Sequence, residues 1–378
     1  MRDERLSRLG LFARGIRVLD LSAFLPGPLA SLLLADMGAE VLKIEPPAGD
    51  AMMQLGPRDA DGAPLFYEAV NAGKTVIRMD LKQPGARAEF LRLVTEHDVL
   101  LEGFRPGVMQ RLGLGYAALQ KINPGLVFCS LSGFGAAGPM SQAAGHDANY
   151  LAQAGVLHRN AQDKPFFYDP PIADVTSSLF AVIAILGALR AREADGLGCE
   201  IDIGLADVAM PLQLFPVAEY GANGAIPQPR TTYLNGGAAY YQVYATQDQR
   251  HVAVGAVESK FWSAFSRAAG KPEWIARQAE TLPQTRLIAD VAALIGKLTL
   301  AECVQRFDDD DCCVSPVLDL GQALSSPRIA ERDLVRRSPD GALQALFPAR
   351  IDGRAPNSRR PLARSHLQTI EQAGATNP

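Results

Sequence analysis

Two residues of this chain, His146 and Asp174, are of the types that carry protons in enzymes. An imidazole titrates near neutral pH. Asp174 precedes an apolar run, residues 179–189, which is long enough for a buried helix. We therefore expect Asp174 at a helix N-terminus, where free backbone N–H groups and the helix dipole stabilise a carboxylate. A carboxylate there could be a nucleophile, a proton carrier or an ordinary helix cap, and the local pattern fits all three.

The elements that must position these residues alternate between strand and helix patterns. Residues 17–21 read as a buried strand, Pro26-Gly27-Pro28 as a turn, residues 29–37 as a helix and residues 41–45 as a second strand. This order predicts a βαβ unit, and so a parallel sheet with a ligand at the carboxyl ends of its strands. The chain has no G-x-G-x-x-G segment, which argues against a dinucleotide fingerprint.

The alternation continues and then changes character. We expect further strands at 75–80, 99–101 and 126–131, and a helix at 84–96. The fold class is predicted as α/β: a doubly wound parallel-sheet large domain at 1–205, a Gly/Pro-rich linker at 206–229, a smaller α+β domain at 230–313, and a segment at 314–378 that returns to the large domain. The smaller domain should hold a hairpin of strands 240–245 and 251–257, followed by a helix from about Glu258.

Composition limits the partners and the compartment. The chain has 378 residues, 48% of them hydrophobic and 21% charged, as in ordinary soluble proteins. Its net charge of −4 argues against nucleic acid or an anionic membrane as the main partner. We expect no membrane span, because the apolar runs read as too short. The five cysteines show no Cys-x-x-Cys or Cys/His spacing, so we expect no metal site and a reducing, cytoplasmic location.

Several motifs together resemble those of the family III CoA-transferases, also called CaiB/BaiF proteins. They occur in the order and at the spacing of that family, at residues 15–47, 102–107, 132–135 with Gly138-Pro139, and around His146 and Asp174. Within the family, Gly145-His146-Asp147 resembles the branch of α-methylacyl-CoA racemases. The resemblance implies an interlocked homodimer that acts on acyl-CoA thioesters, with coenzyme A as part of the substrate and no separate cofactor.

The resemblance also implies roles for the site residues. Inversion at the α-carbon of a 2-methylacyl thioester requires a base on each face, and the racemases use a histidine and an aspartate that match His146 and Asp174. Glu258 matches a glutamate that lies beside that aspartate in the racemases. Gly145 would let the ligand approach the backbone, and Asp147 could fix the imidazole tautomer. Backbone N–H groups near Asp174 are candidates for stabilising the enolate oxygen.

The family binds CoA through its first domain. The matching positions here are Leu25, Pro26, Lys74, Phe104, Arg105 and Arg111. The cations would meet phosphates, and Phe104 with the turn backbone would cover the adenine. Pro46 and Ala72 stand where the family commonly has arginines, so the phosphate contacts of this chain should differ from the usual set.

Two other functions fit parts of the same sequence. In a CoA-transferase the aspartate at position 174 would attack an acyl-CoA, and residues 172–178 are less glycine-rich than the racemase pattern, which leaves that reaction open. His146 and residues 235–238 favour the racemase instead. A non-catalytic acyl-CoA-binding protein is the third alternative, because Pro46 and Ala72 depart from the family pattern.

Overall fold

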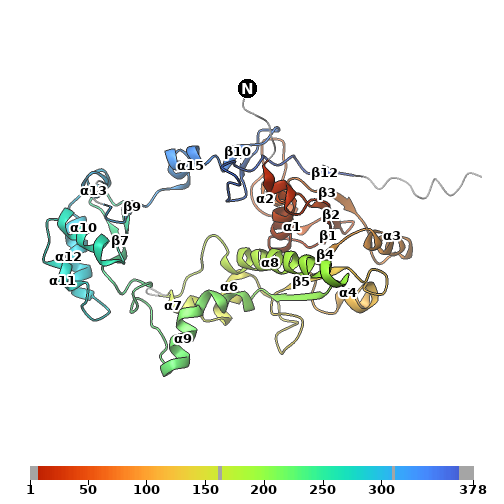
Figure 1. Cartoon of the computed structure of the whole chain (residues 1–378), viewed down its shortest axis with the longest axis horizontal. Helices are drawn as coiled ribbons and strands as arrows, with labels where there is room; N and C mark the ends of the chain where they lie inside the picture. The colour runs from red at the N-terminus through yellow and green to blue at the C-terminus, as the bar shows by residue number, and fades with distance from the viewer. Residues whose placement is uncertain (1–6, 161–163, 309–310, 366–378) are drawn as a thin grey trace, which may run out of the picture. The chain divides into compact units, whose positions relative to one another are not determined.

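The computed structural model describes residues 7–160, 164–308 and 311–365. The chain forms two units, each with its own core (Figure 1). Unit 1 takes the residues up to Ala154, Tyr168–Leu212 and the residues from Ser326 onward. Unit 2 takes Gly155–Phe167 and Gln213–Ser325. Each unit is described by itself below.

Unit 1 is built on a seven-stranded sheet in the order β12-β3-β2-β1-β4-β5-β6. Every strand pair in it is parallel. Its strands are β1 (Arg17–Leu21), β2 (Glu40–Glu45), β3 (Thr75–Arg78), β4 (Val99–Glu102), β5 (Val127–Ser132), β6 (Glu200–Gly204) and β12 (Ala363–Arg364). The predicted α/β class with a parallel sheet is confirmed. The strand order reverses between β1 and β4, and in such sheets ligands bind in the crevice beyond the carboxyl ends of those strands.

Helices cover both faces of the sheet. On one face α1 (Pro26–Asp36) packs against α8 (Ile172–Asp195) and against β1 and β2. On the other face α3 (Pro84–Thr95) contributes Phe90 to a buried cluster with Leu19 and Leu100 of the strands. Figure 1 shows β1, β2 and β3 between α1 and α3. Because side chains alternate along a strand, Leu19 faces α3 and its neighbour Asp20 faces α1.

The remaining elements of unit 1 are short. They are η1 (Arg8–Leu11), η2 (Ala51–Gln54), α2 (Leu65–Asn71), α4 (Val108–Arg111), α5 (Tyr116–Leu119), α6 (Asp147–Gln153), η3 (Asp207–Ala209), α15 (Pro327–Arg332), β10 (Val335–Arg337) and β11 (Leu343–Ala345). The C-terminal stretch adds β12 to the β3 edge of the sheet. Arg359 fixes this stretch through a bidentate pair with Asp36 at the end of α1, with both N–O distances 2.7 Å. The residues from Ser326 onward thus belong to unit 1.

Helix α8 corrects one expectation. By length and composition alone it could cross a bilayer, whereas the apolar runs had been expected to be too short. A buried helix of a soluble protein passes the same test, and α8 packs against α1, β5 and β6 in unit 1. Its residues Ala181, Ile185 and Leu189 are buried there. Within unit 1, α8 is a layer of the fold.

Unit 2 contains a three-stranded antiparallel sheet in the order β7-β8-β9. Its strands are β7 (Tyr241–Ala245), β8 (His251–Gly255) and β9 (Val314–Pro316). Its helices are α7 (Val156–Arg159), α9 (Leu214–Asn223), α10 (Ser259–Ala268), α11 (Trp274–Arg277), α12 (Thr285–Ile295), α13 (Leu300–Phe307) and α14 (Leu320–Leu324), with η4 (Pro211–Gln213) where the two units join in sequence. The predicted hairpin and the helix after Glu258 both lie here.

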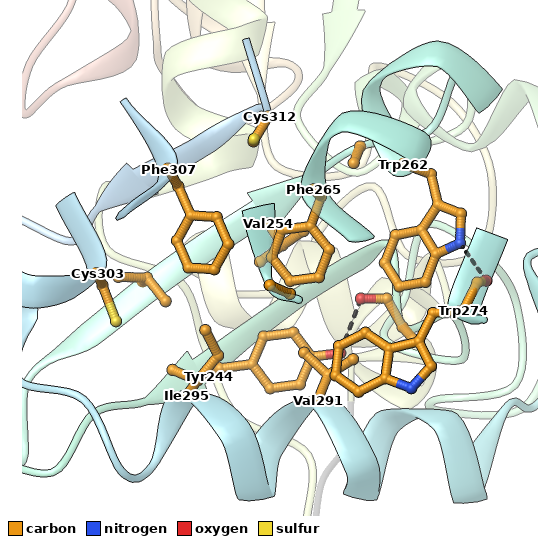
Figure 2. Packing of buried hydrophobic residues seen from close by; sticks show 14 of the residues in the cluster. Tyr244, Val254, Trp262, Phe265, Trp274, Val291, Ile295, Cys303, Phe307 and Cys312 are labelled. Carbon is orange, nitrogen blue, oxygen red and sulfur yellow. Dashed lines mark hydrogen bonds between the residues drawn. The ribbon is translucent and has the colours of Figure 1, made fainter. Parts of the chain in front are cut away.

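Aromatic rings form the centre of unit 2 (Figure 2). Phe265 stacks on Trp262 and on Phe307, with ring centroids 5.3 and 4.9 Å apart. The rings of Trp274 and Phe265 are also stacked, with centroids 6.5 Å apart. The indole N–H of Trp262 donates to the backbone carbonyl of Trp274 at 2.8 Å, so this buried polar group has a partner. Each ring of this size buries a large apolar area, which stabilises the core of a small unit.

The unit boundaries differ from the predicted domain boundaries. Residues 206–229, expected as a linker, hold the helix α9, and Gly224 ends that helix in a left-handed conformation. Residues 314–325, expected in the returning segment, include β9, which pairs with β8 in unit 2. A three-residue strand is too short to show an alternating pattern, so only its pairing partner reveals it.

Candidate active site

Asp174 lies in the first turn of α8, as the sequence predicts. The residue before the helix, Pro171, has no side chain that could cap it. Asp147 supplies the cap from 26 and 27 residues away: its Oδ1 accepts the backbone N–H groups of Ala173 at 2.6 Å and Asp174 at 3.2 Å. The start of α8 is therefore fixed by a carboxylate from another helix, α6.

The environment of Asp174 moves its pKa toward neutrality. The pKa of this carboxyl is raised from 3.8 to about 6, chiefly by burial and also by the neighbouring Asp147 carboxylate, while His146 acts in the opposite direction. Burial raises the pKa of Asp147 as well, and the negative charge of Asp147 disfavours the ionised form of Asp174. A carboxyl with a pKa of about 6 can hold a proton and release it within the physiological range, which suits general acid–base chemistry.

His146 precedes α6 and its side chain is exposed. Its backbone N–H donates to Oδ1 of Asn149 at 3.1 Å, which fixes the chain at the start of this helix. The imidazole meets the ring of Phe24 edge-on, with centroids 6.2 Å apart and an interplanar angle of 83°. The His146 side chain and the backbone N–H of Asn149 also form part of a capping box at this helix start.

Both candidate bases line one cavity of about 370 Å³ in unit 1. Its wall comes from the loops that follow three neighbouring strands, β1, β4 and β5, and from the segment before α6. The contributing residues include Phe24, Pro26, Phe104, Arg105, Gly133, Gly145, His146, Tyr150 and Asp174. The cavity thus lies at the carboxyl ends of the strands, where the strand order reverses, as the βαβ pattern predicts.

Comparison with known proteins identifies the family. A family model for CoA-transferase family III matches residues 14–363. The chain belongs to CoA-transferase family III. The curated relatives of this family member include α-methylacyl-CoA racemase of Mus musculus, 35% identical over 324 residues that cover 84% of this chain and 81% of the mouse protein. They also include acetyl-CoA:oxalate CoA-transferase of Acetobacter aceti, 32% identical over 364 residues, covering 92% and 91% of the two chains.

A solved structure gives the same result for the fold. The crystal structure of a CaiB/BaiF family protein from Brucella suis matches with a TM-score of 0.81 and 27% identity, covering 93% of this chain and 96% of that one. The predicted family is therefore confirmed. Because the relatives include both a racemase and a CoA-transferase, membership covers both reactions and does not choose between them.

The expected CoA-binding positions of this family III member fall into two groups. Pro26, Phe104 and Arg105 line the cavity, and Leu25 directly precedes α1 beside it. Phe104 is fixed by Glu102, whose Oε2 accepts the Phe104 backbone N–H at 2.7 Å. Arg111 is exposed on α4, and its guanidinium lies over Gly107, where a Cβ would come within 3.1 Å of it. These positions stay predictions for CoA contact.

Lys74 is a correction. Its side chain is fully buried, and its Nζ donates to Pro28 O at 2.8 Å, Asn71 Oδ1 at 3.0 Å and Asp20 Oδ2 at 3.3 Å. All three ammonium protons have partners inside unit 1, so none is left for a phosphate. Burial also lowers the pKa of Lys74 to about 7, against the attraction of Asp20. Its role in this structure is to join α1 and α2 to the sheet.

The expected reasons for Gly145 and Asp147 also change. A Cβ at Gly145 would lie 2.8 Å from the ring of Tyr150, so this glycine makes room for a tyrosine whose hydroxyl donates to the Gly145 carbonyl at 2.5 Å. Asp147 is directed at the N-terminus of α8, and among the described residues no hydrogen bond from the imidazole to its carboxylate is found. The N–H groups of Ala173 and Asp174 are therefore already occupied and do not serve an enolate oxygen.

Glu258 belongs to unit 2, where it precedes α10 and is exposed. Its expected partnership with Asp174 of unit 1 stays a prediction. The described residues contain no group of three or more His, Cys, Asp or Glu side chains that could hold a metal ion.

Sequence reasoning missed a buried ionic network under the cavity. Lys43 is fully buried, pairs with Asp50 at 3.0 Å and donates to the Ser22 carbonyl at 2.6 Å. The signal was available: Asp20 and Lys43 are charged residues within buried strand patterns, and such residues must be paired. Their partners could not be read, because the partners depend on which strands are neighbours.

Proposed function

We propose that this family III member inverts the α-carbon of a 2-methylacyl-CoA thioester by two-base proton transfer. One base removes the α-proton, and the C–H electron pair moves into an enolate whose negative charge rests on the thioester oxygen. The other residue, protonated at that moment, returns a proton to the opposite face. Coenzyme A is part of the substrate, no separate cofactor takes part, and we expect the reaction in the cytoplasm.

One observation supports this proposal most directly: His146 and Asp174 line the same cavity. An imidazole and a carboxyl with a pKa of about 6 can both exchange protons near neutral pH. The pair could therefore work in both directions, as a racemase requires. The likeness to the mouse racemase over most of the chain agrees with it.

CoA transfer is the second candidate, and a specific observation favours it too. The Acetobacter aceti CoA-transferase matches over 92% of this chain. In that reaction an Asp174 oxygen attacks the thioester carbonyl, the CoA thiolate leaves, and a mixed anhydride forms. His146 would then have no required part in the chemistry.

Incubation in D2O separates the two reactions. Wild-type protein with a single enantiomer of a 2-methylacyl-CoA, and with no acid acceptor, should incorporate deuterium at the α-carbon and racemise the substrate. With an acceptor acid present, the CoA thioester of the acceptor should not accumulate. Exchange of CoA without wash-out of the α-proton would overturn the racemase proposal in favour of transfer. Neither reaction, despite CoA binding, would favour a non-catalytic acyl-CoA-binding protein.

Substitution assigns the two bases. His146→Ala should abolish racemisation and leave slow exchange from the enantiomer whose proton faces Asp174, and Asp174→Ala should show the opposite bias. Two matched controls are His158→Ala and Asp61→Ala, which replace the same residue types at exposed positions outside the cavity wall. If either control loses activity to the same degree, the assignment to the cavity residues fails.

A homodimer completes the proposal. Large apolar side chains are exposed on α8, at Leu179 and Ile183, and on α9, at Leu214 and Phe215. Clusters of such side chains mark interaction surfaces. Sedimentation at working concentration should give a dimer, and Ile183→Arg should shift it toward the monomer. A fully active wild-type monomer would contradict this part of the proposal.

A further inference from the structure

The loop between β1 and α1 contains a residue in an unusual backbone conformation. Phe24 has φ of +63°, in the left-handed region that residues other than Gly, Asn and Asp rarely adopt. A phenylalanine has no short polar side chain that could stabilise this conformation locally. Contacts from outside the loop must therefore hold it, and such residues are frequent at functional sites.

Two buried charged residues supply those contacts. Nζ of Lys43 donates to the Ser22 carbonyl at 2.6 Å and pairs with Oδ2 of Asp50 at 3.0 Å. Oδ1 of Asp50 accepts the backbone N–H of Phe24 at 3.4 Å and that of Met52 at 2.9 Å. The side chains of both residues are essentially excluded from water, at 0% and 1% exposure. The pair thus fixes the loop at Ser22 and again at Phe24.

The ring of Phe24 is the part of the loop that reaches the cavity. It lines the same wall as His146 and meets the imidazole edge-on at 6.2 Å. Edge-to-face ring pairs have a preferred geometry. Asp147 is turned to α8, where it accepts the backbone N–H groups of Ala173 and Asp174. Beyond the capping box with Asn149, the Phe24 ring is a contact that sets the orientation of the imidazole.

We propose that Phe24 is the positioning residue for the His146 imidazole, and that the Lys43–Asp50 pair holds Phe24 in place. This goes beyond the proposed function, because the contact exists whether the cavity racemises thioesters or transfers CoA. Its kinetic consequence rests on the proposed function: a displaced imidazole should slow only the proton transfer that His146 performs.

The direct test observes the imidazole. The chain has five histidines, so a protein labelled with 13C at histidine Cε1 gives few resonances, and the His146 signal is the one missing from His146→Ala. Phe24→Ala should shift and broaden this signal, because the neighbouring ring is lost. Phe24→Tyr, which keeps the ring, should leave it close to the wild-type position. Phe12→Ala, another exposed phenylalanine outside the cavity wall, serves as the matched control.

Kinetics give the second readout. Phe24→Ala should lower kcat about tenfold to a hundredfold for the enantiomer whose proton goes to His146, with a small change in KM, and Phe24→Tyr should restore it. Removal of Asp50 from the pair by Asp50→Asn, which keeps the shape and an acceptor oxygen, should move the imidazole signal in the same direction as Phe24→Ala but less far.

The outcomes are separable. An unchanged His146 signal in Phe24→Ala overturns the proposal, and so does an equal effect of Phe12→Ala. If the wild-type protein shows no α-proton exchange, the proposed function fails, yet the labelled imidazole still decides the positioning role. If Asp50→Asn does not fold, the exposed Phe24 variants carry the test alone.

Discussion

Asp174 is an anion in a place that disfavours negative charge, and this has a consequence for stability. Its folded-state pKa is raised from 3.8 to about 6, first by burial and then by Asp147. Between these two values the unfolded chain is ionised while the folded chain still holds the proton. The folded state therefore loses stability as the pH rises from about 4 to about 6, and the loss stays constant above that.

Asp174→Asn, which has the same shape and no charge, should thus stabilise the protein at pH 7 and have little effect near pH 4. Urea denaturation at several pH values across this range measures the difference in the free energy of unfolding. Asp61→Asn, at an exposed position, is the control and should give a difference that does not change with pH. If Asp174→Asn raised the free energy of unfolding equally at all pH values, the Asp174 carboxyl would have an ordinary pKa.

The guanidinium side chain of Arg105 belongs to a residue that lines the cavity and could bind a phosphate of CoA. Arg105→Ala should weaken CoA binding by about 1.5–3 kcal/mol, because a hydrogen bond between charged groups is lost. Calorimetry with CoA measures the change, and Arg111→Ala tests the second expected position. Arg328→Ala, exposed on α15, is the control for net charge. Equal affinity in the wild type and both test variants would assign the phosphates to other residues.

At the scale of elements, α8 depends on a cap that comes from α6. Asp147→Ala removes the acceptor for two backbone N–H groups and should cost about 1–2 kcal/mol of unfolding free energy. Asp147→Asn keeps an acceptor oxygen and should cost less. Both variants remove a carboxylate that raises the pKa of Asp174. The acid limb of the pH–rate profile should therefore move to lower pH in both.

The loss of stability and the shift of the acid limb together show whether Asp147 caps α8 or instead fixes the tautomer of the His146 imidazole. If Asp147 acted mainly on His146, Asp147→Asn would change the 13C signal of the imidazole and leave the acid limb where it was. Hydrogen exchange at the Ala173 and Asp174 amides reports the cap itself, and it should quicken in Asp147→Ala.

At the scale of the whole molecule, the two units carry separate cores and separate spectroscopic signals. The only two tryptophans of the sequence, Trp262 and Trp274, both lie in the aromatic core of unit 2 (Figure 2). Fluorescence excited at the indole band therefore follows unit 2 alone, whereas far-UV circular dichroism follows both units. We expect the two signals to report different unfolding midpoints.

A crossed pair of substitutions tests this. Phe265→Ala opens the core of unit 2 and should lower its free energy of unfolding by about 3–5 kcal/mol. The unfolding midpoint measured by fluorescence should therefore fall. Phe90→Ala opens the core of unit 1 by a similar amount and should lower the circular dichroism transition with little change in fluorescence. Equal shifts of both signals in both variants would show that the units unfold as one.

The sequence by itself determined the features that rest on neighbouring residues. The strand at Arg17–Leu21 shows a buried apolar pattern, and its predicted bounds are those of β1. Asp174 was expected at a helix start because an apolar run follows it, and α8 begins there. Both signals lie within one helix or strand length, where the chain's own periodicity decides the conformation.

Only the tertiary structure decided which charges are buried and what they hold. In the sequence Lys74 looks like a surface cation, yet the order β3-β2-β1 in the sheet and the packing of α1 bury it against Asp20. Asp147 and α8, or Phe24 and His146, are far apart along the chain and meet because parallel strands bring their following loops to one edge. Strand order and register set such contacts, and no local pattern encodes them.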